Sequence, residues 1–222
     1  MEYVVAGCAA FALMGFFDLA SLKRIPYLKQ VIGLAGSLSL GYSLVRAGVF
    51  GGKLSIPAWL SYAGWPLLIP SLFLLIYSLF LEIPFRRTYA SNGVGEKLVT
   101  TGTYALVRHP GVLWFGLFLA GLLLVSRSRL LLVAAPVWLT ADVLYAWLQD
   151  RFLFERMFPG YAEYRQGTPM LIPTRRSILR CWRSIGYFRD RTDRQERASR
   201  DGVQKLAPTI EGASTMSEIR PC

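Results

Sequence analysis

Histidine, cysteine and acidic residues are scarce in this 222-residue chain, and each shortage excludes a class of site. One histidine and three cysteines without metal-binding spacing (Cys8, Cys181 and Cys222) cannot form a zinc site of the usual type, so no metal is expected. The odd number of cysteines argues against a disulfide framework. Paired carboxylates for glycoside chemistry and a nucleophile elbow are missing. No Gly-x-Gly-x-x-Gly motif follows a strand pattern, so a Rossmann cofactor domain is not supported.

Charged residues are also few, at 18% of the chain against about a quarter in soluble domains, while hydrophobic residues reach 53%. The sequence therefore predicts an all-α integral membrane protein with about five transmembrane helices. The apolar runs cover residues 3–20, 30–50, 56–81, 112–125 and 130–148. The first would be about 27 Å long as a helix, close to one hydrocarbon thickness. Residues 126–129 alone separate the last two runs, which predicts an antiparallel hairpin.

Basic residues outnumber acidic ones 25 to 14, but their placement fits anionic lipid headgroups better than nucleic acid. Alternate loops differ in basic content. One side holds Lys23, Arg24, Lys29, Arg86, Arg87, Lys97 and Arg108, and the other holds Arg46, Lys53, Arg127 and Arg129. The positive-inside rule then places the N-terminus outside and the C-terminus in the cytoplasm, with a bacterial inner membrane as the expected location.

The chain changes character at Pro173, after which 11 of the 25 basic residues lie. We expect residues 174–222 to be a basic cytoplasmic tail. Its first part is basic and aromatic and is expected to lie on the inner leaflet: Arg175, Arg176, Arg180, Trp182 and Arg183. From about residue 188 polar and charged residues dominate, which predicts disorder.

The single histidine, His109, stands between Arg108 and Pro110 directly before the fourth apolar run. Proline suits the first turn of a helix, so free backbone N–H groups and the positive dipole end would face the cytoplasm there. With Arg108 they would attract a carboxylate or phosphate, and His109 could exchange a proton near neutral pH. The structural alternative is that Arg108 reaches lipid phosphate, Pro110 starts the helix, and His109 has no chemical role.

A second polar group follows the fifth run. If that helix continues past the membrane surface, Gln149 and Asp150 reach the cytoplasmic border, unless they are solvated charges on an ordinary amphipathic extension. Phe158-Pro159-Gly160 predicts a helix stop, after which Tyr161 and Tyr164 would fold back over the site.

Inside the fifth run, Asp142, Tyr145 and Gln149 recur at helical spacing and share one face. An acid near mid-helix costs about 2.5–3.5 kcal/mol on insertion scales, so Asp142 is expected to face protein or a polar cavity. Asp18 is expected nearer the interface. The candidates for a substrate pocket are Asp142, Tyr145, Tyr161 and Tyr164.

From about residue 98 to residue 173 the chain resembles the isoprenylcysteine carboxyl methyltransferase and phospholipid methyltransferase superfamily. The matching pieces, beside the helical hairpin, are Gly102-Thr103-Tyr104, Arg108-His109-Pro110, the pair Gln149-Asp150, and Phe158-Pro159-Gly160-Tyr161-Ala162-Glu163-Tyr164 with Thr168-Pro169 following. The resemblance implies a helical bundle that binds S-adenosylmethionine at the cytoplasmic face. It makes residues 1–173 a methyltransferase-like domain whose motif-bearing part is 98–173.

Carried over by position, the resemblance assigns Arg108 and His109 to the reaction. It also implies a cofactor site made of Tyr104, Arg108, His109, Pro110, Gln149 and Asp150. A cofactor carboxylate would bind Arg108 and the helix N-terminus, whereas ribose hydroxyls or an ammonium group would bind Asp150. Because the sulfonium charge disappears during methyl transfer, positioning and water exclusion matter more than a strong acid. The expected acceptor is a lipid or another hydrophobic small molecule.

Several positions depart from the family pattern. Gln149-Asp150 stands in place of Glu-Glu, and Val112 and Trp114 replace the Tyr and Gly that many members carry. Gly167 replaces an arginine of the prenylcysteine enzymes, which argues against a prenylated protein C-terminus as substrate.

Two other functions remain open. Membrane sterol reductases carry a similar Arg-His-Pro motif and use NADPH, whose extra phosphate could bind Arg86, Arg87 or Arg151. A non-catalytic relative kept as a membrane scaffold would fit the loss of an acid at position 149.

Overall fold

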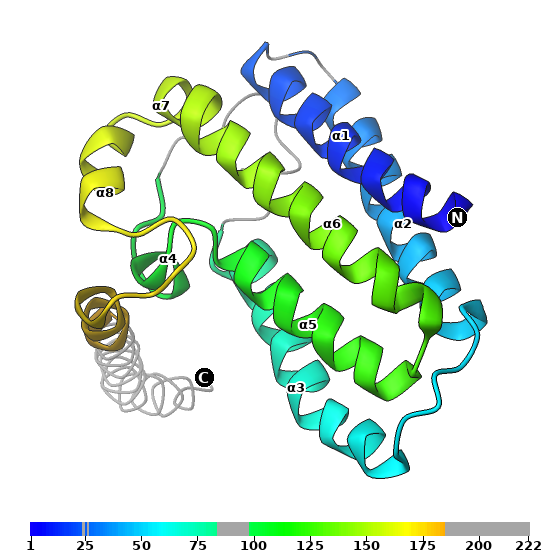
Figure 1. Ribbon diagram of the computed structural model, residues 1–222. Coiled ribbons are helices and arrows are strands. Elements are labelled where there is room, and N and C mark those ends of the chain that lie inside the picture. Colours follow the sequence, from blue (N-terminus) through cyan, green and yellow to red (C-terminus); the bar gives the residue numbers. More distant parts are fainter. Residues whose placement is uncertain (24, 26, 84–97, 185–222) are drawn as a thin grey trace, which may run out of the picture.

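The computed structural model describes residues 1–23, 25, 27–83 and 98–184, and every regular element within them is a helix (Figure 1). The long N-terminal helices are α1 (Glu2–Leu22), α2 (Leu28–Phe50) and α3 (Ala58–Ile76), the last continued by the π-helical turn η1 (Tyr77–Leu81). After the short α4 (Thr103–Leu106) come α5 (Pro110–Ser126) and α6 (Arg129–Leu148). The chain then forms the π-helical turn η3 (Gln149–Leu153), α7 (Phe154–Met157), α8 (Tyr161–Gly167) and a helix over residues 175–184. Arg24, Arg86, Arg87, Lys97 and the segment expected to be disordered from about 188 lie outside the described residues.

Four helices are long and apolar enough to cross a membrane: α1, α2, α3 with η1, and the helix that begins with α6. The expected all-helical architecture with apolar helices of membrane-spanning length is therefore confirmed, although four helices rather than five reach this length. The fourth apolar run becomes α5, which has 17 residues because it begins at Pro110 and ends where Arg127 takes the left-handed conformation, with φ 52°. The predicted hairpin is confirmed, since Arg127 and Ser128 alone separate α5 from α6 and the two helices pack together.

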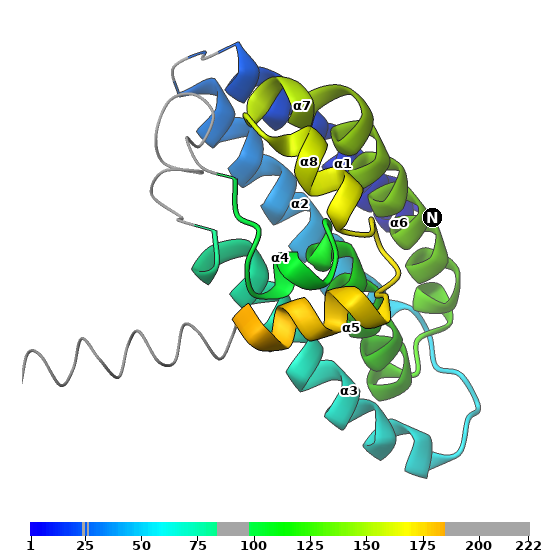
Figure 2. The same cartoon turned by 90° about the vertical axis from the view of Figure 1, so that its left-hand side faces the viewer.

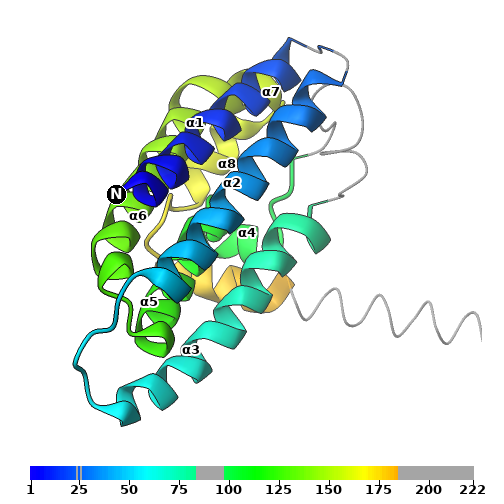
Figure 3. The ribbon, with the colours of Figure 1, turned by 90° about the vertical axis from the view of Figure 1, so that its right-hand side faces the viewer.

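The helices form two packed pairs joined by α6. α1 lies along α2, α3 lies along α5, and α6 contacts both α1 and α5 (Figures 1 and 3). Trp138 of α6 is fully buried at the centre, and its indole N–H donates to the Val4 carbonyl at 3.0 Å. α1 can approach this closely because Gly7 has no side chain, and a Cβ there would overlap the Trp138 ring. The core around them includes Phe11, Phe115, Leu119, Leu131 and Ala134.

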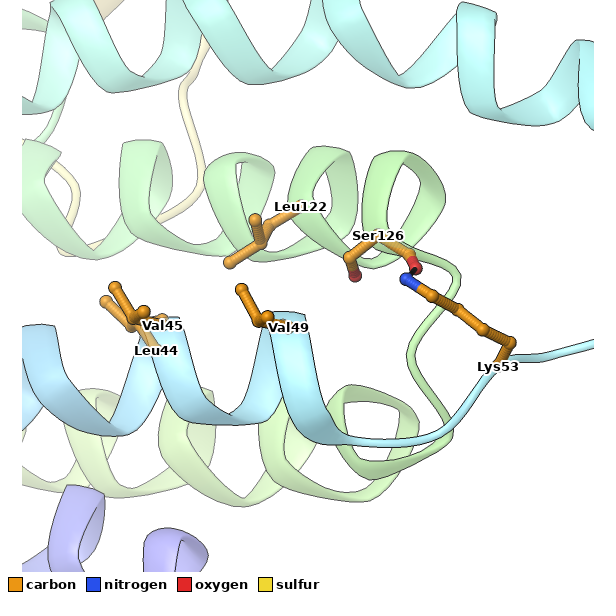
Figure 4. Close-up of a pocket in the computed structure, with 7 residues that line it drawn as sticks. Leu44, Val45, Val49, Lys53, Leu122 and Ser126 are labelled. Carbon is orange, nitrogen blue, oxygen red and sulfur yellow. Dashed lines mark hydrogen bonds between the residues drawn. The ribbon is translucent and has the colours of Figure 1, made fainter.

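The α5–α6 turn is fixed by side chains rather than by a long loop. Ser128 Oγ donates to the Ala47 carbonyl at 2.5 Å and accepts from the Leu131 N–H at 3.2 Å, which caps α6. The Lys53 ammonium donates to the Ser126 carbonyl at 2.9 Å (Figure 4). Beside this turn lies an apolar hollow of about 370 Å³ lined mainly by Leu44, Val45, Val49 and Leu122. The polar clusters described next lie at the other end of the bundle (Figure 1).

Candidate functional site

Arg108 and His109 lie in the extended link between α4 and α5. Their backbone N–H groups donate to the carbonyls of Pro169 and Met170 at 2.9 and 3.2 Å, so the segment after α8 holds the link in place. Pro110 is the first residue of α5 and His109 is its N-cap residue, as the Arg-His-Pro pattern predicts for a helix start. Both side chains therefore stand at the positive end of the α5 dipole.

A single buried carboxylate, that of Asp150, lies at the centre of the site. The Nη1 atom of Arg108 is 2.8 Å from Asp150 Oδ1 and 2.9 Å from Oδ2, and the two side chains are only 10% and 7% exposed. His109 Nε2 lies 3.6 Å from the same carboxylate and Arg165 Nε lies 3.8 Å from it. A buried charge is costly unless it is paired, so Arg108 is the partner that makes burial of Asp150 tolerable.

Asp150 reaches this position because α6 does not stop at the end of its apolar run. The helix continues through η3, where Asp150 is buried, into α7. α7 ends at Met157, and Gly160 takes a φ of +81°, which a residue with a side chain rarely adopts. The helix stop expected at Phe158-Pro159-Gly160 is confirmed, and α8 folds back so that the Tyr161 hydroxyl donates to Asp150.

Aromatic rings cover the carboxylate. His109 stacks on Phe154 at 5.5 Å between ring centroids, and Phe154 meets Tyr161 edge-on at 5.3 Å. Tyr164 packs against Tyr161 at 5.8 Å and donates its hydroxyl to the Tyr104 carbonyl at 2.7 Å. Burial, and for Tyr161 also the neighbouring carboxylate, raises the pKa of both α8 tyrosines. Both hydroxyls therefore stay protonated and act as donors.

Two buried nitrogen atoms of the cluster make no close hydrogen bond within the described part of the chain. They are Arg108 Nε and His109 Nε2, the second of which has the Asp150 carboxylate 3.6 Å away. The indole N–H of Trp114, at one of the positions that depart from the family pattern, is in the same condition within that part of the chain. Since an unpaired buried polar atom costs free energy, these atoms are places where a bound polar group would be accepted.

Glu82, at the end of η1, was not singled out by the sequence, yet it holds the Gly102-Thr103-Tyr104 segment. Its carboxylate accepts the Thr103 N–H at 2.7 Å and the Thr103 hydroxyl. Gly102 has a φ of +61°, and a Cβ on it would overlap the Glu82 carboxylate. Burial raises the pKa of Glu82, and the two hydrogen bonds from Thr103 oppose that shift. An acid directly after an apolar run was the signal that could have drawn attention to it.

Gln149, expected beside Asp150, belongs to a different network. Its side-chain amide donates to Asp18 Oδ2 at 2.7 Å, and the Tyr145 hydroxyl donates to the same oxygen at 2.7 Å. Successive residues on a helix project in different directions, so Gln149 faces α1 while Asp150 faces the Arg-His-Pro segment. Asp18 is only 5% exposed. It is therefore buried between helices, whereas its place near the end of the first apolar run predicted a position nearer the membrane interface.

Asp142, a candidate for the substrate pocket, lies outside both of these polar networks. It shares a helix with Tyr145 and Gln149, but it makes no hydrogen bond or ion pair with any residue that the structure describes. It also does not line the groove described next.

A groove of about 530 Å³ opens next to the cluster. α8 forms part of its wall with Glu163, Tyr164 and Gly167, and the 175–184 helix contributes Arg180 and Ser184. The remaining lining residues are Leu98, Thr100, Ala105, Pro159, Gly160 and Thr168. Its volume lies within the range of about 300–1,000 Å³ found for small-molecule sites. Tyr164 joins the groove to the cluster, because it lines the first and packs on Tyr161 in the second.

Comparisons with protein-family models, with curated proteins and with solved structures found no match to this chain. The resemblance to membrane methyltransferases therefore rests on the motif residues of the sequence alone.

Proposed function

We propose that this protein transfers a methyl group from S-adenosylmethionine to a lipid or another hydrophobic acceptor at the cytoplasmic face of a membrane. The observation that carries the proposal is the meeting of two motif pieces 42 residues apart. Arg108 and Asp150 pair at 2.8 Å, with His109 and the α8 tyrosines around them. A buried, charged and ring-covered cluster at the end of membrane helices is a functional-site candidate by default.

The residues present fit the cofactor, whose bound sulfonium would supply the methyl group. Arg108 keeps its buried Nε free among the described residues, and the first turn of α5 adds backbone N–H groups, so a carboxylate would bind there. Asp150 accepts hydrogen bonds and attracts cationic groups. Pro110 begins α5 beside these groups, whereas the Tyr104 hydroxyl donates to the Ser78 carbonyl of η1 at 3.2 Å and would support the site from there. Gln149 would act indirectly, through its hydrogen bond to Asp18 of α1.

The aromatic cover of the cluster suits a cationic ligand. A cation is attracted to ring faces by about 0.5–2 kcal/mol, most where water is excluded. The rings of His109, Phe154 and Tyr161 pack on one another, and the first and the last of them contact the Asp150 carboxylate. Together they would position a sulfonium and keep water from it. Methyl transfer is an in-line displacement that depends on such positioning, so none of these residues needs to act as a strong acid.

The position of the site relative to the membrane determines how the methyl acceptor reaches it. We take α5 as a fifth span, since its 17 residues extend about 26 Å and it packs along α3 and α6 inside the bundle. Five spans with an outer N-terminus place the cluster and the groove at the cytoplasmic surface, where the alternate loops are basic. An acceptor dissolved in the leaflet would reach the site laterally.

Titration of S-adenosylmethionine into the purified full-length protein in detergent tests the proposal. We expect saturable binding that weakens by about tenfold or more in His109→Ala and Asp150→Asn, because each loses a polar contact of the cluster. Glu155→Gln is the matched control, since Glu155 lies five residues further on, is 50% exposed and bonds Arg165. It should bind as the wild type does.

Thermal unfolding of each variant keeps the result interpretable. Equal binding by folded His109→Ala and Asp150→Asn variants would place the cofactor elsewhere and contradict the proposal. Stabilisation by NADPH alone would favour a membrane reductase. For that function Arg151 is exposed, and Arg86 and Arg87 lie outside the described residues. Stabilisation by neither cofactor would favour a non-catalytic scaffold.

A further inference from the structure

The helix over residues 175–184 is fixed at its start by its own side chains. The Thr174 N–H donates to Ser177 Oγ at 2.9 Å, and the Ser177 N–H donates to Thr174 Oγ1 at 3.2 Å. Such reciprocal bonds satisfy donors that a helix N-terminus otherwise leaves free. Ser177 is 1% exposed, so the helix is anchored against the protein at this residue.

The inner face of this helix is tied to the motif-bearing part. Ser184 Oγ accepts the Gly102 N–H at 2.9 Å, and Arg180 donates to the Gly167 carbonyl at 2.6 Å. Arg180 and Ser184 also line the 530 Å³ groove. One of the four arginines of the helix is therefore turned to the protein, and the helix serves as a wall of the groove.

The outer face is apolar and strongly exposed. Ile178, Leu179 and Trp182 are 48%, 59% and 79% exposed. At about 100° per residue they form one continuous stripe. Arg176 and Arg183 lie along one edge of this stripe, on the side of Leu179, and Arg175 begins it. All three are exposed, and the chain holds no acidic residue between Glu163 and Asp190. An apolar stripe bordered by cationic side chains is the composition of helices that lie in a membrane interface.

The direction of the helix agrees with that composition. Figure 1 looks almost along it, next to α4, while α5 and α6 run across the same picture. Figure 2 shows it from the side, again next to α4. It therefore crosses the direction of the spans at the end of the bundle that carries the Asp150 cluster, as a helix in the plane of a bilayer surface would.

We propose that the 175–184 helix docks on anionic lipids of the membrane leaflet at the end of the bundle that carries the Asp150 cluster. Ile178, Leu179 and Trp182 enter the boundary between headgroups and acyl chains, and Arg175, Arg176 and Arg183 pair with lipid phosphates. Each arginine favours the docked state on the order of fivefold. Because this helix is also a wall of the groove, docking holds the groove mouth at headgroup level. The proposal does not depend on methyl transfer.

Accessibility of a single cysteine to a soluble maleimide tests it. Leu179→Cys and the matched Gln166→Cys, on the exposed face of α8, are each made in full-length protein with Cys8, Cys181 and Cys222 replaced by serine. Labelling rates are compared in nanodiscs with phosphatidylglycerol, in nanodiscs of phosphatidylcholine alone, and in detergent at several protein concentrations. We expect position 179 to label at least about tenfold more slowly than position 166, only with phosphatidylglycerol.

Replacing Arg175, Arg176 and Arg183 by glutamine should restore fast labelling at position 179 while position 166 stays unchanged, and an unchanged Tm in detergent shows that the protein remains folded. Equal labelling of both positions in every setting would overturn the proposal. Protection in phosphatidylcholine that persists without the arginines would also overturn it, since anionic lipid would then play no part. Protection in detergent that rises with protein concentration would assign the stripe to a second copy of the chain.

Discussion

The network between α1 and α6 makes a sharp prediction about Gln149. Its amide donates to Asp18 Oδ2 at 2.7 Å, and the Tyr145 hydroxyl donates to the same oxygen. Asp18 is only 5% exposed, so water cannot replace a lost donor easily. Gln149→Glu would place a second carboxylate against the first. We expect this substitution to destabilise the folded protein, although glutamate is the residue that the family pattern favours.

The size of the effect follows from the contact that is lost. A hydrogen bond to a charged group is worth about 1.5–3 kcal/mol. For a chain of this size about 1 kcal/mol moves Tm by roughly 2–4 °C, so Gln149→Glu should lower Tm by about 3–12 °C near neutral pH. The loss should shrink in acid, because a proton shared between two carboxyl groups restores a donor.

Exchange of donor and acceptor isolates the contact. In the double variant Asp18→Asn with Gln149→Glu, an amide again faces a carboxylate, so most of the lost Tm should return. Intrinsic fluorescence on heating in detergent measures all four proteins, with Glu155→Gln as an exposed control that should change little. A double variant that melts as low as the two single losses added together would refute the reasoning, because the two residues would then act independently.

Three further substitutions test other contacts by the same melting assay. Arg108→Met should cost about 3–5 kcal/mol because it leaves the Asp150 charge buried without its closest partner, and a cost below about 1 kcal/mol would contradict a buried pair. Glu82 has a raised pKa in the folded state, so its contribution to stability is full below its ordinary value of 4.5 and declines as the pH rises. The Tm of wild type relative to Glu82→Gln should therefore fall with rising pH, and the opposite trend would contradict the burial argument. Gly7→Ala should cost about 1–3 kcal/mol because the added Cβ overlaps the buried Trp138 ring. Gly15→Ala is the control, since it lies in the same helix with open space around it, and it should cost nothing. Equal effects of the two substitutions would mean that α1 can shift to make room for the Cβ.

Features that depend on neighbouring residues could be predicted from the sequence. Pro110 begins α5 because its missing N–H and fixed φ suit a first turn. α7 ends at Met157 because Phe158, the residue before a proline, is extended, and Gly160 then supplies a φ of +81° at the start of α8. The hairpin follows from a short link between two apolar runs. Each of these is decided by residues within a few positions.

Contacts between distant residues could not be predicted in this way. Asp18 and Gln149 are 131 positions apart, and Glu82 and Thr103 are 21 apart, so the pairs are set by how the helices pack. Helical spacing correctly puts Asp142 on the helix that carries Tyr145, but it cannot say which neighbour each side chain meets. The number of long spans also differed, since α5 proved shorter than the others.

The same packing gives a reason for the pair Gln149-Asp150. Each residue faces a charge that the other does not: Gln149 meets the carboxylate of Asp18, and Asp150 meets the guanidinium of Arg108. A donor is needed at the first position and an acceptor at the second, so glutamine is the suitable residue at 149 once α1 carries an acid. The π-helical turn that contains both is a feature common at functional sites. Here it connects α1 to the Arg-His-Pro segment, because Gln149 bonds Asp18 and Asp150 bonds Arg108. A substitution at Asp18 should therefore shift the position of Asp150, which lies in the same helical turn as Gln149.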